Sequence, residues 1–340
     1  MTRLIPLRYF LHRTLYLVAV LWVAATLNFV LPRLAGRDPI LERLTELEAS
    51  IGGHRGLWVA EAIDSYREWA GLNQPLWGQY VQYLQNMLNM DFGYSFSRNR
   101  PVWDVVSYAL PWTMGLLGTT TFISFALGTF AGGLSAWRRQ DRLLNVSVSL
   151  LMALAVIPPF IIGLVLADTL AFRLKLFPIA GMFTPGRFVD LGDIEWWLDV
   201  LHHAAVPALA LLLGTAGSWA MGMRGMMVTV LGSDFIAFAE AKGVKRLRLI
   251  LSYAIRNVML PQTTLLAMSL GSLVSSVTLV EIMFGYPGVG SILESAIRAF
   301  DYNLIQGCVF FLILSIGLAT FVLDLSYPLL DPRISYRKQT

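Results

Sequence analysis

Long apolar stretches separated by short polar segments dominate this chain. Crossing the roughly 30 Å hydrocarbon core of a bilayer takes about 20 apolar residues in an α-helix. Six stretches are that long, and they lie at residues 12–31, 112–136, 146–171, 204–231, 257–283 and 305–327. The pattern therefore predicts an all-α membrane protein with six transmembrane helices.

The polar segments between these stretches carry weaker helical patterns. "GLWVAEAIDSYREWAGL" and "PLWGQYVQYLQNMLNM" in the first long loop combine helical spacing with aromatic residues, which predicts short interfacial helices. "EWWLDVLHH" predicts another, with Trp196 and Trp197 at the level of the lipid headgroups. Pro158 and Pro159 interrupt the third span, and such a break is tolerated where neighbouring helices compensate.

Residues 233–256 form a basic segment between two apolar spans. Ser233 and Asp234 are helix-start residues, "FIAFAEAK" covers just over two turns, and Gly243 can end that helix in left-handed geometry. "KRLRLILSYAIRN" then resumes as a basic amphipathic stretch. The pattern leaves two interpretations open. The segment is either a loop lying on anionic lipid or a docking helix whose alanines allow close approach.

Composition and charge add an orientation. Of the 340 residues, 56% are hydrophobic and only 14% are charged, too apolar for a soluble domain. Lys and Arg concentrate before the first span, in the 137–145 loop, in the 224–256 segment and in the tail, so both termini are expected in the cytoplasm. The expected organisation is a cytoplasmic N-terminus with an uncleaved first helix, an extracytoplasmic loop, a five-helix core and a cytoplasmic tail (1–31, 32–111, 112–327 and 328–340).

Several chemistries have no matching motif. No lysine is followed by Ser or Thr, so the chain has no GxxxxGK[ST] phosphate loop and is not expected to hydrolyse ATP alone. A single cysteine, Cys308, excludes an intrachain disulfide. His202 and His203 are adjacent and would point about 100° apart on a helix, so no metal site is predicted. No catalytic residue and no nucleic-acid partner are expected.

Three carboxylates fall within or at the ends of spans, where ionisable residues suggest function. With the orientation inferred from charge, Asp168 lies near the outer end of the third span, about 33 Å along the helix from its start at residue 146. Asp324 lies near the inner end of the sixth span, so the two are in opposite leaflets and form no protease-like pair. Glu281 begins "EIMFGYPGVG". That stretch reads either as a gate or receptor contact at the outer face, or as a capped, partly solvated turn.

Hydroxyl side chains mark two spans. They suit close helix packing and equally a weakly binding lining for a polar solute, and the pattern leaves both open. The candidates for a pathway lining are Thr120, Ser124, Ser269, Ser272 and Ser276.

"AEAKG", followed thirteen residues after Gly243 by Arg256, resembles the cytoplasmic EAA loop of ABC importer permeases. The motif's closing Pro is Arg256 here and its leading Glu is Ala237, departures similar to the B-type permeases of the oligopeptide, dipeptide and nickel importers. "GLNQPLWGQYVQYLQNMLNMDFGYSFS", "FGYPGVGSILESAIRAFDYNLIQG" and "LLDPRISY" resemble other segments of that branch, so the resemblance covers nearly the whole chain.

The resemblance implies a type I ABC importer permease fold, in which 233–256 contains a coupling helix that docks on an ATPase. It implies docking by Ala239, Glu240, Ala241, Gly243, Val244, Arg246 and Arg256, and an outer gate or binding-protein contact at Glu281, Pro287, Gly288 and Gly290. Implied partners are a second, homologous permease subunit in a heterodimer, two ATPase subunits that hold the ATP and Mg, an extracytoplasmic binding protein and membrane lipid. This chain would bind no cofactor itself.

The implied function is ATP-driven import of di- or oligopeptides by alternating access across the bacterial cytoplasmic membrane, with oligosaccharide or nickel chelate as alternative substrates. Two alternatives belong to other functional classes. A stand-alone secondary carrier would lack the docking segment and would often show inverted repeats. A membrane enzyme would need a set of catalytic residues, and none is predicted in this chain.

Overall fold

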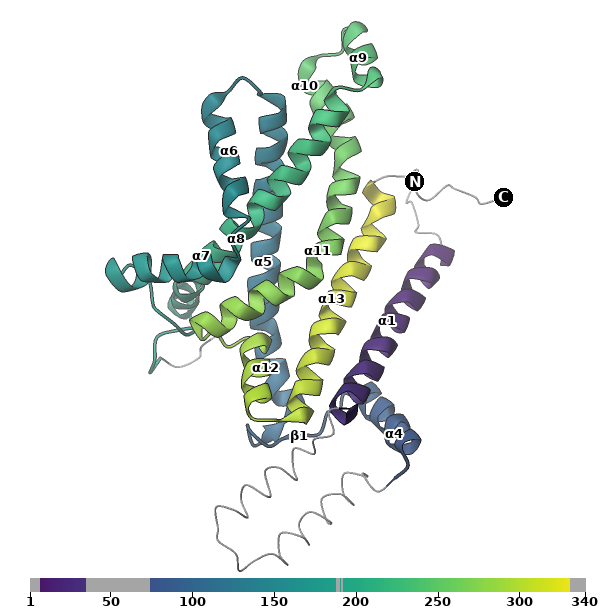
Figure 1. The fold of residues 1–340 in the computed structure, drawn as a ribbon, viewed down its shortest axis with the longest axis vertical. Helices are drawn as coiled ribbons and strands as arrows, with labels where there is room; N and C mark the ends of the chain where they lie inside the picture. Colours follow the sequence, from purple (N-terminus) through teal and green to yellow (C-terminus); the bar gives the residue numbers. More distant parts are fainter. Residues whose placement is uncertain (1–6, 35–73, 188–189, 191, 331–340) are drawn as a thin grey trace, which may run out of the picture. The chain divides into compact units, whose positions relative to one another are not determined.

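The computed structural model describes residues 7–34, 74–187, 190 and 192–330. Within these residues the chain is almost entirely helical (Figure 1). The elements in chain order are α1 (Leu7–Leu34), α4 (Leu76–Leu88), β1 (Tyr94–Ser95), β2 (Arg100–Pro101), α5 (Val102–Trp137), α6 (Arg142–Leu154), α7 (Pro159–Leu166), the π-helical η1 (Ala167–Arg173), α8 (Ile194–Leu231), α9 (Asp234–Ala241), α10 (Arg246–Arg248), the π-helical η2 (Leu249–Ala254), α11 (Ile255–Phe284), α12 (Val289–Arg298) and α13 (Tyr302–Leu330).

Five helical stretches in the described part of the chain are long and apolar enough to cross a membrane. They are Leu7–Val30, Val102–Trp137, Ile194–Leu231, Arg246–Phe284 and Tyr302–Ser326. The third expected span, at residues 146–171, differs from the prediction. It consists of α6 and the α7–η1 helix, which are bent by 105° at Pro158 and Pro159. Proline lacks an N–H and cannot continue the preceding helix. The distance of about 33 Å between the start of this span and Asp168 was calculated for one continuous helix. That distance is therefore wrong.

The chain divides into two compact units. The larger unit comprises Met1–Leu15, Pro111–Ser291 and Ile316–Thr340, and the smaller unit comprises Tyr16–Leu110 and Ile292–Ser315. In the larger unit α8 packs against α6, α7 and α11. Small residues make this packing close: a Cβ at Gly132 of α5 would collide with the backbone of Ala220, and one at Gly217 with that of Leu151. Close backbone approach of this kind is typical of membrane helices.

The smaller unit is organised around a buried carboxylate. Asp301 Oδ2 accepts hydrogen bonds from Ser95 Oγ at 2.6 Å and from the Ser97 N–H and Oγ at 2.9 and 2.7 Å. These bonds hold the β1–β2 ribbon, a small departure from the all-α expectation. Asn28 Nδ2 donates to the Gln306 carbonyl at 2.9 Å and ties α1 to α13.

The described residues include two of the three predicted interfacial helices. The helix expected in "PLWGQYVQYLQNMLNM" is confirmed as α4, whereas "EWWLDVLHH" is the first part of the long helix α8 rather than a separate element. Trp196 is fully buried and stacks edge-on with Trp112, so protein and not lipid covers it, whereas Trp197 is 41% exposed. Their level relative to the headgroups stays a prediction. The segment "GLWVAEAIDSYREWAGL" and the tail beyond 330 lie outside the described residues.

Candidate functional site: helix α9 and the Glu281 turn

The basic segment forms the expected short helix. α9 covers Asp234–Ala241, and Ser233 occupies the N-cap position, although its hydroxyl bonds the Val230 carbonyl at 2.5 Å instead of capping. In Figure 1, α9 and α10 lie beyond the ends of α8 and α11. The chain therefore turns back through a separate helical element between two spans.

Gly243 ends α9 in left-handed geometry, as predicted, with φ at +78°. The Gly243 N–H donates to the Glu240 carbonyl at 2.9 Å, and the Val244 N–H donates to the Ala239 carbonyl at 3.2 Å. These two bonds form a Schellman motif, which satisfies carbonyls that a helix end leaves free. Open space surrounds the Gly243 Cα, so the backbone conformation alone makes glycine favourable there.

One face of α9 anchors it to the larger unit. Ile236 joins a buried apolar cluster supplied by α5, α8, η2 and α11, which we call the anchor cluster. Its buried members are Ala136, Met223, Met227, Ile236, Ile250, Ala254 and Val258. Because one cluster includes residues of five elements, α9 is packed against the ends of three long helices.

The structure separates the predicted docking residues into two groups. Ala239 is buried and Val244 is partly buried, so these two pack against the chain itself. The exposed group is Glu240, Ala241, Gly243, Arg246 and Arg256.

Sequence reasoning missed Phe235 and Phe238, whose side chains are 45% and 63% exposed on α9. Lys242 Nζ lies 4.5 Å from the centre of the Phe238 ring. The helical phase set by Ile236 and Ala239 would have placed both rings on the outward face.

The second predicted site is a turn closed by Glu281. Thr113 Oγ1 donates to Glu281 Oε1 at 2.7 Å, the Gly290 N–H donates to Oε2 at 2.8 Å, and the Val289 N–H donates to Thr113 Oγ1 at 2.8 Å. A Cβ at Gly288 would fall on the Glu281 carboxylate. The structure thus brings together Glu281, Gly288 and Gly290, with a partly buried Pro287 beside them.

Burial changes the interpretation of this turn. Glu281 is completely buried, so its side chain is no contact surface in this conformation, and the partly solvated alternative does not hold either. Burial and the neighbouring Glu281 also raise the pKa of Tyr286 to about 12, so its phenol stays protonated.

Thr113 was not predicted as a site residue, because the sequence gives no signal for it beyond its position after Pro111.

The predicted lining residues do not converge on one polar surface. Thr120 and Ser124 are buried on α5, and their hydroxyls donate to carbonyls of their own helix. On α11, Ser269 and Ser276 are partly buried and Ser272 is exposed. An exposed face runs along α11, through Pro261, Thr264, Leu265, Met268, Ser272, Ser275 and Leu279.

The remaining ionisable candidates have separate partners. Asp168 pairs with Arg173 at 2.8 Å and Asp324 with Arg13 at 3.1 Å, so each carboxylate is held by a different arginine. His202 Nε2 lies 2.9 Å from the Leu176 carbonyl. In the described residues no group of three or more His, Cys, Asp or Glu side chains is arranged to hold a metal ion.

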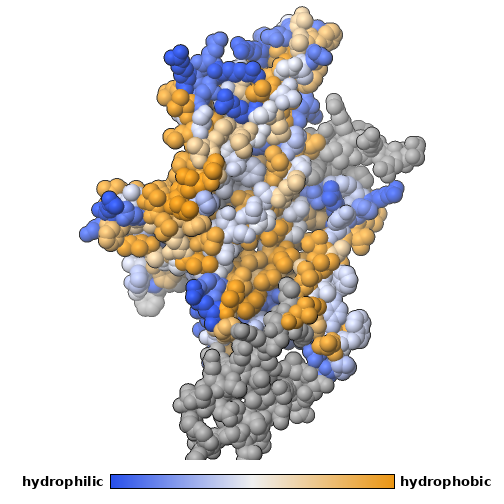
Figure 2. Space-filling view, in the orientation of Figure 1, coloured by the Kyte–Doolittle hydropathy of each residue, from blue (hydrophilic) through white to orange (hydrophobic). Residues whose placement is uncertain are grey.

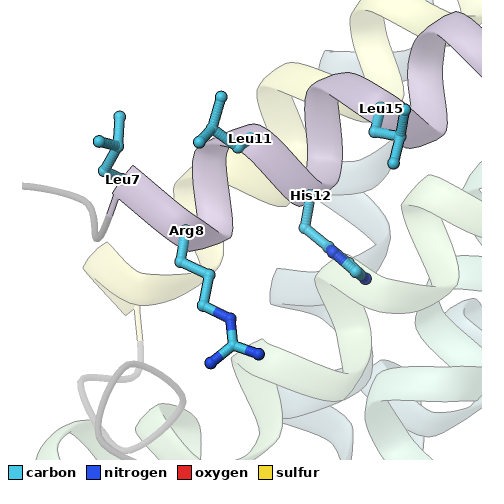
Figure 3. A pocket seen from close by; sticks show the side chains of 5 residues that line it. All are labelled: Leu7, Arg8, Leu11, His12 and Leu15. Carbon is cyan, nitrogen blue, oxygen red and sulfur yellow. The ribbon is translucent and has the colours of Figure 1, made fainter.

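A hollow near the N-terminus offers little for binding. Five residues of α1 line it, and Arg8 and His12 extend to the same side of the helix (Figure 3). Because a single helix supplies every lining residue, the hollow is an indentation of its surface.

The fold defines a multi-pass helical membrane protein with an exposed helix between two spans. A family described as "binding-protein-dependent transport system inner membrane component" matches residues 124–336. The chain belongs to this family of transport subunits and is a multi-pass protein of the inner membrane.

Relatives resemble the chain over nearly its whole length. A putative peptide permease protein of Brucella suis is 32% identical over 330 residues, which cover 96% of this chain and 99% of the relative. The dipeptide transport system permease proteins of Escherichia coli and Bacillus subtilis are 29% and 30% identical, over 97% and 98% of this chain and 99% of each relative.

Proposed function

We propose that the chain is the transmembrane permease subunit of an ABC importer that moves di- or oligopeptides into the bacterial cytoplasm. The observation that carries this proposal is the full-length similarity to proteins described as peptide and dipeptide permeases. The partly exposed helix α9 supports it, because a stand-alone carrier has no use for such an element between two spans.

In this proposal α9 is the coupling helix. Its outward face, with Phe235, Phe238 and Glu240, enters a cleft on a partner ATPase. Its inward face is fixed to the anchor cluster, so a displacement of α9 is transmitted to α5, α8 and α11. ATP and Mg are held by the partner ATPases, and this chain supplies no residue to the hydrolysis step.

Alternating access follows from this connection. When ATP binding brings the ATPases together, α9 moves with its ATPase and carries the packed helix ends with it. The close backbone packing of α5 on α8 favours movement of these helices as one body. We assign the exposed face of α11 and its serines to the interface with a second, homologous permease and to the peptide path between the two.

At the opposite end of α11, the Glu281 turn is proposed to act as a supporting element of the outer gate. The buried carboxylate fixes the turn through Thr113 and Gly290, and an extracytoplasmic binding protein would contact the exposed residues around it.

Deletion of this gene in its host tests the transport function. The proposal predicts loss of uptake of radiolabelled di- or oligopeptides, restored by the wild-type gene, with uptake of free amino acids unchanged. Calorimetry on the cognate binding protein then identifies the ligand. Tight binding of an oligosaccharide or a nickel chelate, with no peptide binding, would contradict the peptide assignment and leave the importer class intact.

A further inference from the structure

A polar cleft lies beside α9 in the larger unit. Its volume is about 760 Å³. The lining residues come from the α5–α6 loop, the end of α8, α9 and the α10–η2 helix: Ala136, Trp137, Arg138, Arg139, Gln140, Asp141, Leu231, Gly232, Ile236, Glu240, Arg246, Leu249 and Ile250.

The cleft is located where membrane spans end. α5 ends at Trp137 and α6 begins at Arg142, while α8 ends at Leu231 and the next span begins at Arg246. Both connections return to the membrane on the side from which they left it. The cleft therefore lies beside the ends of these spans, and hydrophilic side chains gather at this end in Figure 2.

Three arginines and two carboxylates line the cleft, a formal excess of one positive charge. Arg138, Arg139 and Arg246 line it and are exposed. None of the three has a carboxylate within ion-pairing distance in the described part of the chain. Of the two acidic lining residues, Asp141 is engaged in capping α6, where its carboxylate accepts from the Leu144 N–H at 3.1 Å. Glu240 is the other.

The walls are partly apolar. Leu231, Ile236, Leu249 and Ile250 line the cleft together with the arginines, and the Arg138 guanidinium lies over the Trp137 ring at 5.6 Å. Directly after Asp141, α6 begins an exposed apolar face at Leu143, Val146 and Leu150. A ligand that suits these surroundings combines an anionic head with hydrocarbon.

We propose that this cleft binds the phosphate group of an anionic phospholipid, with Arg138, Arg139 and Arg246 around the phosphate and the acyl chains along the apolar face of α6. Basic pockets at the membrane boundary between spans suit such headgroups, and arginine binds phosphate oxygens through paired N–H donors. Because Ile236 and Glu240 of α9 also line the cleft, a bound lipid contacts the same helix that is proposed to dock on the ATPase.

The purified full-length chain in detergent micelles allows a direct test. A cysteine at Gln140, with Cys308 replaced by Ala, carries an environment-sensitive fluorophore inside the cleft. Micelles are titrated with phosphatidylglycerol, phosphatidylcholine or inorganic phosphate. We expect saturable binding of phosphatidylglycerol, with phosphatidylcholine and inorganic phosphate weaker by about tenfold or more.

Two double variants with the same charge change localise the effect. R138Q/R139Q leaves the proposed ATPase-docking residues intact and should weaken phosphatidylglycerol binding by about tenfold. R142Q/R248Q alters arginines outside the cleft lining and should stay within about twofold. R138K/R139K keeps the charge and should retain most binding, which distinguishes lost charge from misfolding.

Three results would overturn the proposal. These are equal affinity for phosphatidylglycerol and phosphatidylcholine, equal weakening by both glutamine double variants, and inorganic phosphate binding as tightly as the lipid, which would assign the cleft to a soluble phosphate. None of them bears on whether the chain transports peptides.

Discussion

The Thr113 hydroxyl donates a 2.7 Å hydrogen bond to the carboxylate of Glu281, 168 positions away in the chain. The same hydroxyl accepts the Val289 N–H, and the carboxylate also accepts the Gly290 N–H. One buried acidic group therefore fixes the end of α11 to α5 and to the start of α12. Breaking a buried polar network leaves groups without partners, which costs more than the bonds themselves contribute.

The close approach of Gly288 to Glu281 gives the first prediction. Gly288→Ala should lower the free energy of unfolding by about 2 kcal/mol, because the added methyl group displaces the carboxylate from its donors. Reversible unfolding in mixed micelles measures this. Gly118→Ala is the matched control, since nothing lies within 4 Å of its added Cβ, and it should not destabilise the chain. Equal stability of both variants would refute the steric argument.

The left-handed turn after α9 gives the second prediction. Gly243→Val should cost on the order of 1–2 kcal/mol at that turn and reduce transport, while membrane insertion stays normal. Gly243→Asn should retain more transport, because asparagine tolerates left-handed geometry. Uptake and co-purification of the ATPase subunits, measured in parallel, check both variants. Wild-type behaviour of Gly243→Val in both assays would remove the coupling role from this turn.

The ion pair between the two ends of the larger unit gives the third prediction. Arg13 Nη1 lies 3.1 Å from Asp324 Oδ2, and the aspartate is only 15% exposed. A double-mutant cycle with Arg13→Gln and Asp324→Asn should give a coupling energy of about 1 kcal/mol, because the partly buried pair is weakly screened. Additive effects of the two single variants would show that the pair contributes nothing.

Membrane orientation gives the fourth prediction. The Lys and Arg distribution predicts a cytoplasmic C-terminal tail. With Cys308 replaced, a cysteine at Ser335 should resist an impermeant thiol reagent in intact cells. A cysteine at Asn99, exposed in the β1–β2 ribbon, should react. Labelling at position 335 with protection at position 99 would show that the topology is the opposite of the predicted one.

The sequence predicted the features that depend on local pattern. Apolar length identified five spans that are single helices in the described part of the chain, and the glycine after "AEAK" identified the left-handed end of α9. Features that depend on tertiary contacts were out of reach. Pro158 and Pro159 signalled a break but not its 105° angle, and nothing around Thr113 or Arg138 indicated a partner for Glu281 or a cleft beside α9. The burial of Trp196 was not predictable, because an aromatic residue near a span end looks the same in sequence whether lipid or protein covers it.

Reconstitution tests the central claim most directly. Proteoliposomes containing this chain, its homologous permease partner and the ATPase subunits should accumulate labelled peptide only when ATP and the loaded binding protein are both supplied. The same complex with Gly243→Val should hydrolyse ATP with little accumulation or fail to retain its ATPases, and the chain alone should hydrolyse no ATP. Accumulation of peptide by the chain alone, without ATPase subunits or ATP, would contradict the account.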